Sequence, residues 1–152
     1  MIASTEVNYP ASGDLYGQIV VDSLGVDEPL FFGDDPTILS RGAGQYVGTV
    51  FPGEKGTTLI GGHNSSGFGK LIDIKVDDVV EVKTTYGTYQ YRVTETKVMK
   101  YNAEEVNASL ERGDQDYLLL YTCYPVNMLG LTDDRFFVYT TYEAGPEIDG
   151  TK

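Results

Sequence analysis

The segment Tyr117-Leu-Leu-Leu-Tyr-Thr-Cys123 carries the strongest structural signal in the chain, because an apolar run ends there in a cysteine. A short run of aliphatic and aromatic residues is typical of a strand that is buried on both faces. The thiol of Cys123 would then lie where a buried strand emerges. Arg135 opens the next predicted strand, Arg135–Thr141, twelve residues later. A loop of this length can bring the cysteine and the arginine together.

Five further segments have the composition or alternation of strands: Tyr16–Val21, Leu30–Phe32, Thr57–Ile60, Val79–Thr84 and Thr88–Thr94. The last two alternate apolar and polar side chains across a turn near Gly87, which predicts a hairpin. Capping residues predict two short helices, Asp35–Gly42 and Asn102–Gly113. We therefore expect a domain of the all-β (mainly β) class. Its strands would form a closed β-barrel of seven or eight strands, accompanied by two short helices. Closure would remove the exposed edges that such strands otherwise carry.

Composition sets limits on the partners and on the domain count. A chain of 152 residues with 41% hydrophobic residues suits one domain. We expect residues 1–13 to form an N-terminal tail, which could be a truncated anchor region, residues 14–143 to form the domain, and residues 144–152 to form a C-terminal tail. The net charge of −12 repels phosphate backbones, so nucleic acid is not expected as a partner. We expect a monomer.

One cysteine and one histidine restrict the chemistry. A single cysteine forms no intramolecular disulfide and no cysteine-cluster metal site, so we predict no metal or cofactor, while calcium modulation stays open. A lone cysteine is most often inert packing, and His63 and Arg135 are each, taken singly, more often ordinary surface residues. Strand ends gather at the rim of a barrel, however, and there His63, Cys123 and Arg135 can meet. Nearby cations would favour the reactive thiolate.

These residues resemble the sortase family. The family signature is Thr-Leu-x-Thr-Cys followed by an arginine on the next strand, and Leu119–Cys123 with Arg135 matches it, except that Leu119 replaces the first threonine. The pair Gly62-His63 is similar to the family's Gly-His, and the resemblance covers residues 14 to 143. The short stretch before Tyr16 and the absence of a long insertion before the last strands make the chain look most like class D sortases.

The resemblance implies a sortase-type barrel and a cysteine transpeptidase. Cys123 would cleave a Leu-Pro-x-Thr-Gly-like sorting signal between Thr and Gly, and His63 would protonate the leaving amine. Arg135 would hold the substrate carbonyl, and Thr122 would help to bind the peptide. The thioester would pass to an amino group of a peptidoglycan precursor or of the cell wall.

The implied substrates are surface proteins that bear sorting signals. The implied location is the extracellular face of the plasma membrane of a Gram-positive bacterium, reached through an N-terminal anchor outside this sequence.

Three other readings stay open. A cysteine peptidase or hydrolase would use the same residues and release the acyl group to water. An inactive sortase-like barrel would bind peptide without chemistry. A redox thiol would need an intermolecular disulfide, because the chain has no Cys-x-x-Cys pair. Product analysis with and without an amine, and trapping of Cys123, would separate these readings.

Overall fold

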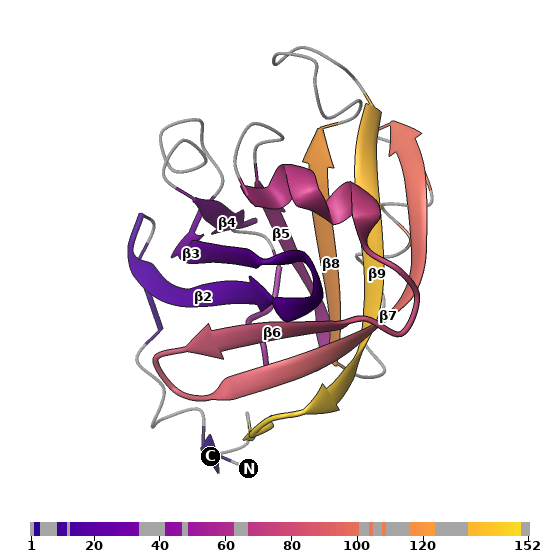
Figure 1. Ribbon diagram of the computed structural model, residues 1–152. Coiled ribbons are helices and arrows are strands. Elements are labelled where there is room, and N and C mark those ends of the chain that lie inside the picture. The colour runs from indigo at the N-terminus through magenta and orange to yellow at the C-terminus, as the bar shows by residue number, and fades with distance from the viewer. Residues whose placement is uncertain are drawn as a thin grey trace.

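The computed structural model describes residues 2–3, 9–11, 13–33, 42–46, 49–62, 67–100, 104, 108, 116–123 and 134–149. Eight strands close into one barrel in the order β2-β3-β4-β5-β8-β9-β7-β6. Their bounds are Leu15–Val21 (β2), Val26–Phe32 (β3), Ala43–Gln45 (β4), Gly56–Gly62 (β5), Val79–Thr84 (β6), Thr88–Lys100 (β7), Asp116–Cys123 (β8) and Asp134–Ala144 (β9). The predicted closed, mainly β barrel is therefore confirmed (Figure 1).

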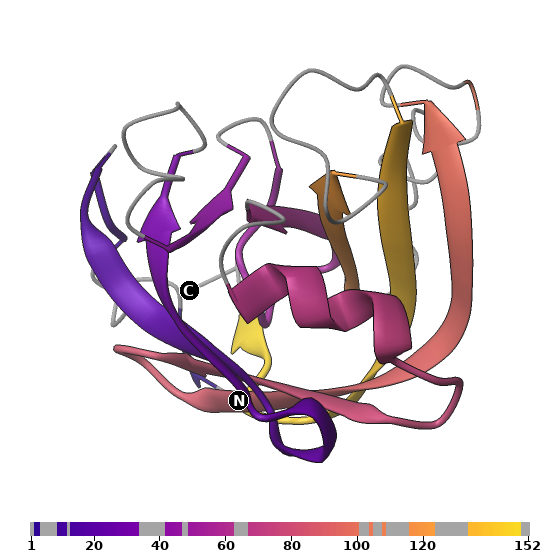
Figure 2. The same cartoon turned by 45° about the horizontal axis from the view of Figure 1, so that its top comes forward.

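Two short strands and two 3-10 helices complete the described elements. β1 (Ile2–Ala3) pairs in parallel with β10 (Ile148–Asp149) beyond the end of the barrel where β8 begins (Figure 1). The 3-10 helix η2 (Asp22–Leu24) follows β2, and η3 (Gly67–Asp73) packs against β3, β5 and β8 (Figure 2). Most residues of the two predicted helices lie outside the described part of the chain. Within the second of them, the described positions Glu104 and Ala108 are helical. The predicted domain boundaries stay predictions.

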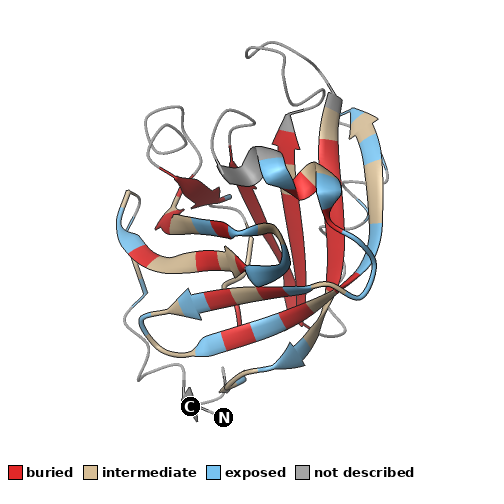
Figure 3. Ribbon diagram, in the orientation of Figure 1, coloured by how far each residue is buried: buried red, intermediate tan, exposed pale blue. Residues whose placement is uncertain are grey.

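Alternation between buried and exposed positions explains why the outer strands form. Along β6 and the first half of β7, one side chain in two enters the barrel and the next faces solvent, as a half-buried strand requires. By contrast, β5 is buried at every position and β8 at nearly every described one (Figure 3). The continuous apolar run of β8 is therefore explained by burial of both of its faces.

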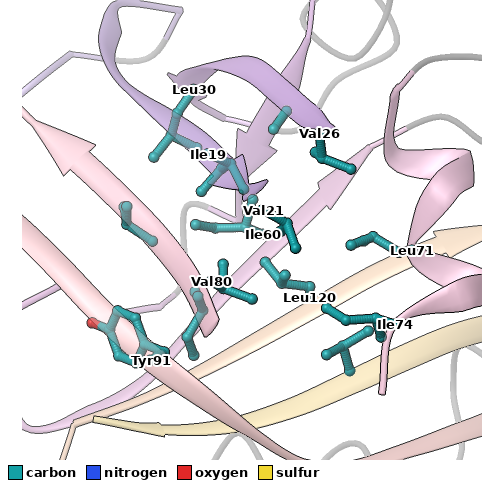
Figure 4. Close-up of a cluster of buried hydrophobic side chains, with 14 of the residues drawn as sticks. Ile19, Val21, Val26, Leu30, Ile60, Leu71, Ile74, Val80, Tyr91 and Leu120 are labelled. Carbon is teal, nitrogen blue, oxygen red and sulfur yellow. The ribbon is translucent and has the colours of Figure 1, made fainter. Parts of the chain in front are cut away.

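The barrel interior holds one large apolar cluster. Ile19, Leu30, Ile60 and Leu120 are each 0% exposed, and they meet side chains of the opposite strands near the barrel axis (Figure 4). Leu71 and Ile74, from η3 and the residue after it, pack into the same cluster. This packing fixes η3 against the barrel. Because the interior is filled by side chains, binding and chemistry belong to the rim and to the outer faces.

The strand register corrects two sequence expectations. β5 does not end before Gly61 and Gly62 but continues through both, because each is paired with β8: Gly61 with Tyr121 and Gly62 with Thr122. β7 continues six residues past Thr94 to Lys100, because β9 offers partners along that whole length. Both extensions lengthen the wall of the barrel toward the end where β8 reaches Cys123.

A polar network lies at the other end of the barrel, where β8 begins. The buried Asp116 carboxylate accepts hydrogen bonds from the Tyr91 hydroxyl, at 2.9 and 3.0 Å, and from the Gly53 backbone N–H, at 3.0 Å. The Gly53 carbonyl accepts in turn from the N–H of Ile148 in β10, at 2.9 Å. Burial raises the pKa of the Asp116 carboxyl to about 7, although both hydrogen bonds oppose the rise.

Candidate active site

Three strand ends converge at the rim where β8 finishes. β8 runs antiparallel to β9, and Cys123 at the end of β8 is directly paired with Arg135 at the start of β9. Residues opposite each other in such a pair have Cα atoms about 4.5–5.5 Å apart. Figure 1 shows β8 ending beside the beginning of β9, with β5 on the other side of β8. The fold therefore brings the backbones of Cys123 and Arg135 together although they are twelve positions apart in sequence.

The histidine segment follows the third of these strands. β5 is parallel to β8, and its last residue, Gly62, is in register with Thr122. His63 comes next in sequence and lies outside the described residues. The residue that precedes His63, Gly62, therefore lies beside Thr122, and Thr122 directly precedes Cys123 in β8. The placement of His63 relative to the thiol stays a prediction.

Arg135 lies between two neighbours on the sheet. Its partner on the β8 side is Cys123, and its partner on the β7 side is Met99. The arginine is partly exposed, whereas Phe136 and Phe137 after it are buried. The two backbone ladders thus fix the Arg135 backbone between β7 and β8, beside the backbone of Cys123, and its predicted role in stabilising the carbonyl stays a prediction.

Thr122 is the residue of β8 that directly precedes Cys123. It is 0% exposed and is paired with Gly62 on one side and with Phe136 on the other. Among the described residues, Thr122 Oγ1 is the single buried polar side-chain atom that has no hydrogen-bond partner. A buried hydroxyl without a partner costs about 1–3 kcal/mol. Thr122 therefore has unused hydrogen-bonding capacity beside Cys123, while its predicted contact with the peptide stays a prediction.

A second apolar cluster covers the outer face of the same strands. Leu59, Leu119, Phe137 and Tyr139 are each at most 9% exposed, and Tyr121 and Met99 are partly exposed members. Because side chains alternate along a strand, Leu119 and Tyr121 share this face of β8. Along β8, this face is closed at Leu119, which is 1% exposed, and partly exposed at Tyr121. Local sequence did not indicate that Tyr121 joins this cluster, because its place follows from the register of β8 with β5, where it is paired with Gly61.

Metal and membrane features can be assessed for the described residues. Among them, no group of three or more His, Cys, Asp or Glu side chains could hold a metal ion. No helix in the described ranges is long and apolar enough to cross a bilayer. Calcium modulation and the membrane-anchored location stay predictions.

The family follows from the barrel, the strand-end pairing and a match along most of the chain. The family model for the sortase domain matches residues 19–143, so the chain belongs to the sortase family. Within the family, its similarity to Sortase D of Bacillus subtilis (strain 168) confirms the predicted resemblance to class D. The two are 24% identical over 130 residues, which cover 86% of this chain and 65% of that relative. The chain thus spans just under two thirds of that relative's length.

Solved structures show the same fold. The Sortase D5 transpeptidase of Clostridium perfringens superposes with a TM-score of 0.77 at 22% identity, and the match covers 90% of this chain and 83% of that one. Sortase C of Clostridium perfringens, solved with the C-terminal cell wall sorting motif, has a TM-score of 0.77 at 25% identity. That match covers 88% of this chain and 73% of that chain.

Proposed function

We propose that this chain is a cysteine transpeptidase that cleaves a Leu-Pro-x-Thr-Gly-like sorting signal between Thr and Gly. The single observation that carries the proposal is the direct pairing of Cys123 with Arg135 across β8 and β9. The pairing of Gly62 with Thr122 supports it, because His63 follows Gly62 in sequence. Membership of the sortase family supports it independently.

The first half of the reaction transfers the acyl group to the cysteine. The Cys123 thiolate attacks the carbonyl carbon of the threonine, a C–S bond forms, and the carbonyl oxygen becomes an oxyanion that Arg135 stabilises. Collapse of this intermediate breaks the C–N bond. The His63 imidazolium gives its proton to the leaving glycine nitrogen. The products of this half are a thioester on Cys123 and a free glycine amine.

The second half transfers the acyl group to an amine. The acceptor amine attacks the thioester carbon, gives a proton to His63, and the C–S bond breaks to return the thiolate. The acceptor in this proposal is an amino group of a peptidoglycan precursor or of the cell wall. The substrates are surface proteins with sorting signals, and the solved sortase C with a cell wall sorting motif supports that substrate class. The reaction would take place on the outer face of a Gram-positive plasma membrane.

Thr122 has a supporting role in this proposal. Its buried hydroxyl next to Cys123 would accept or donate a hydrogen bond once the sorting peptide is bound, which would relieve its unsatisfied state. Thr122→Val keeps the shape of the side chain and removes the hydroxyl. We expect this variant to raise KM for the peptide more than it lowers kcat.

A transfer assay with an added amine tests the proposal. A Leu-Pro-x-Thr-Gly peptide incubated with the protein and a glycine-based amine should give the amide product, and Cys123→Ala should give none. His63→Ala, which removes the proton-transfer group, should lower the transfer rate by about 10²–10⁴-fold. Arg135→Ala, which removes the oxyanion donor, should lower it by about 10²–10³-fold.

Arg92→Ala is the matched control, since Arg92 is an exposed arginine bonded to Glu143 on the barrel wall. It should retain wild-type activity. If Arg135→Ala transferred as fast as Arg92→Ala, the assigned role of Arg135 would be wrong. Acyl release to water at an unchanged rate in saturating amine would instead favour the hydrolase reading.

A further inference from the structure

A turn at the end of the barrel where β8 begins connects three parts of the chain. The turn, residues 51–54, is closed by the Glu54 N–H on the Phe51 carbonyl, at 3.0 Å, and by the Phe51 N–H on the Glu54 carboxylate, at 2.8 Å. Within it, the Gly53 N–H donates to the Asp116 carboxylate and the Gly53 carbonyl accepts from the Ile148 N–H. One residue of the turn therefore joins the start of β8 to the C-terminal strand β10.

The packing around Gly53 leaves no room for independent movement. Its φ of +97° lies in the left-handed region that favours glycine. A methyl group there would lie 2.5 Å from the Tyr89 hydroxyl oxygen and 3.1 Å from Cγ1 of Ile148. The Tyr89 hydroxyl in turn donates to the Pro146 carbonyl at 2.5 Å. A displacement of Gly53 therefore displaces the segment that carries β10.

The Asp116 carboxyl group lies among acids and phenols. The groups that face it are Tyr89 and Tyr91 of β7, Tyr142 of β9, Glu54 of the turn and Glu147 of the C-terminal segment. None of these five brings a positive charge, so a buried carboxylate is disfavoured here. A protonated Asp116 is neutral and still accepts from the Gly53 N–H through its carbonyl oxygen. Protonation thus suits the closed arrangement, whereas ionisation favours an arrangement in which water reaches the carboxylate.

We propose that Asp116, acting through Gly53, is a proton-dependent latch for β10: the strand is docked while the carboxyl is protonated and is released more often once it ionises. β1 is the parallel partner of β10, with Ile2 opposite Ile148, so release of β10 also removes the partner of β1 (Figure 1). This release is a local opening, and the barrel stays folded. The latch does not depend on the proposed transpeptidase function.

The expected size of the opening follows from the two states of the carboxyl. Burial raises the pKa of Asp116 from 3.8 to about 7, and opening returns it toward 3.8. Because the closed state holds the proton more tightly, the open fraction increases as the pH rises from 4 to 7 and is constant above. Each pH unit is worth tenfold, so the opening equilibrium should increase by up to about 10³-fold across this interval.

Amide hydrogen exchange, followed by NMR on the full chain, measures this opening. The protection factor of the Ile148 N–H corrects for the pH dependence of intrinsic exchange, and it should fall by up to about 10³-fold between pH 4 and pH 7. Global unfolding also exposes Asp116, so a reference for that process is needed. The Leu120 N–H provides it, because β8 is paired on both sides at this residue. Ile148 should be less protected than Leu120 at every pH.

Three variants test the parts of the latch. Asp116→Asn cannot ionise, so its Ile148 protection should not depend on pH. Gly53→Ala, whose methyl group would press on the Ile148 side chain, should lower the Ile148 protection at every pH while Leu120 stays protected. Asp73→Asn removes an exposed carboxylate elsewhere and should retain the wild-type pH dependence.

Several outcomes would overturn the latch. One is a wild-type Ile148 protection that is constant with pH, or one that falls equally in Asp116→Asn. Equal protection of Ile148 and Leu120 would also overturn it, because β10 would then leave only when the barrel unfolds. Wild-type protection of Ile148 in Gly53→Ala would show that Gly53 transmits nothing. Transfer activity does not enter these measurements, so a failed transpeptidase assay would leave the latch standing.

Discussion

Asp116 should make the stability of the barrel depend on pH. Its carboxylate is only 6% exposed at the start of β8, where the Tyr91 hydroxyl and the Gly53 N–H donate to it. Burial raises its pKa from 3.8 to about 7, so the folded protein favours the protonated form. The acid binds its proton more tightly when folded. The stability it contributes is therefore greatest below pH 4, falls between pH 4 and pH 7, and is constant above.

The size of the effect follows from the two pKa values. At about 1.36 kcal/mol per pH unit, the interval from 3.8 to about 7 amounts to about 4 kcal/mol in the free energy of unfolding. Asp116→Asn has nearly the same shape and cannot ionise, so it lacks this pH dependence. Relative to wild type, the variant should gain up to about 4 kcal/mol between pH 4 and pH 8. A constant offset from altered hydrogen bonds does not change this slope.

Urea unfolding at a series of pH values provides the assay. The chain has no tryptophan and twelve tyrosines, so tyrosine fluorescence and far-UV circular dichroism report on folding. Asp73→Asn, which removes an exposed carboxylate at the last residue of η3, is the control for the change in net charge. Parallel pH profiles for the wild type and Asp116→Asn would refute the reasoning, as would an equal slope in Asp73→Asn.

Three further predictions concern packing, and each is checked by equilibrium unfolding at one pH. Leu120→Ala, at a position that is 0% exposed, should lower the free energy of unfolding by about 2–5 kcal/mol. Val98→Ala, at a position that is 46% exposed, is the control and should change it by less than about 0.5 kcal/mol. Equal losses in the two variants would argue against the interior cluster. Gly17→Ala should weaken the β2–β6 seam, because its Cβ would overlap the carbonyl of Lys83, and a variant as stable as wild type would contradict that register. Thr140→Val should cost about 1 kcal/mol, because it removes a buried 2.7 Å hydrogen bond to a β8 carbonyl, and no loss would show that this bond contributes nothing.

Local patterns predicted the strands that carry the candidate site. The apolar run before Cys123 and the basic residue that opens the next strand became β8 and β9, because burial and chain direction can be read from adjacent residues. The β6–β7 hairpin was predictable for the same reason. Closure of the barrel followed from the number of short strands, whose edges need partners.

Other features depend on contacts between distant segments and were not predictable from local sequence. β4 is only Ala43, Gly44 and Gln45, and it is a strand because β3 and β5 pair with it on both sides. η3 forms over a glycine-rich stretch because Leu71 packs into the core. The Tyr121–Gly61 pair depends on the register of two strands sixty residues apart. His63 was predicted from the family pattern, and its position is still to be tested.

The convergence of Cys123, Arg135 and the segment after Gly62 is tested most directly by locating the acyl group. The protein would be incubated with a Leu-Pro-x-Thr-Gly peptide without amine, quenched in acid, digested and examined by mass spectrometry. The account predicts a thioester of the Leu-Pro-x-Thr fragment on Cys123 that disappears when an amine is added and forms far more slowly in Arg135→Ala. Cleavage of the peptide that persists in Cys123→Ala, or an acyl group on any other residue, would contradict it.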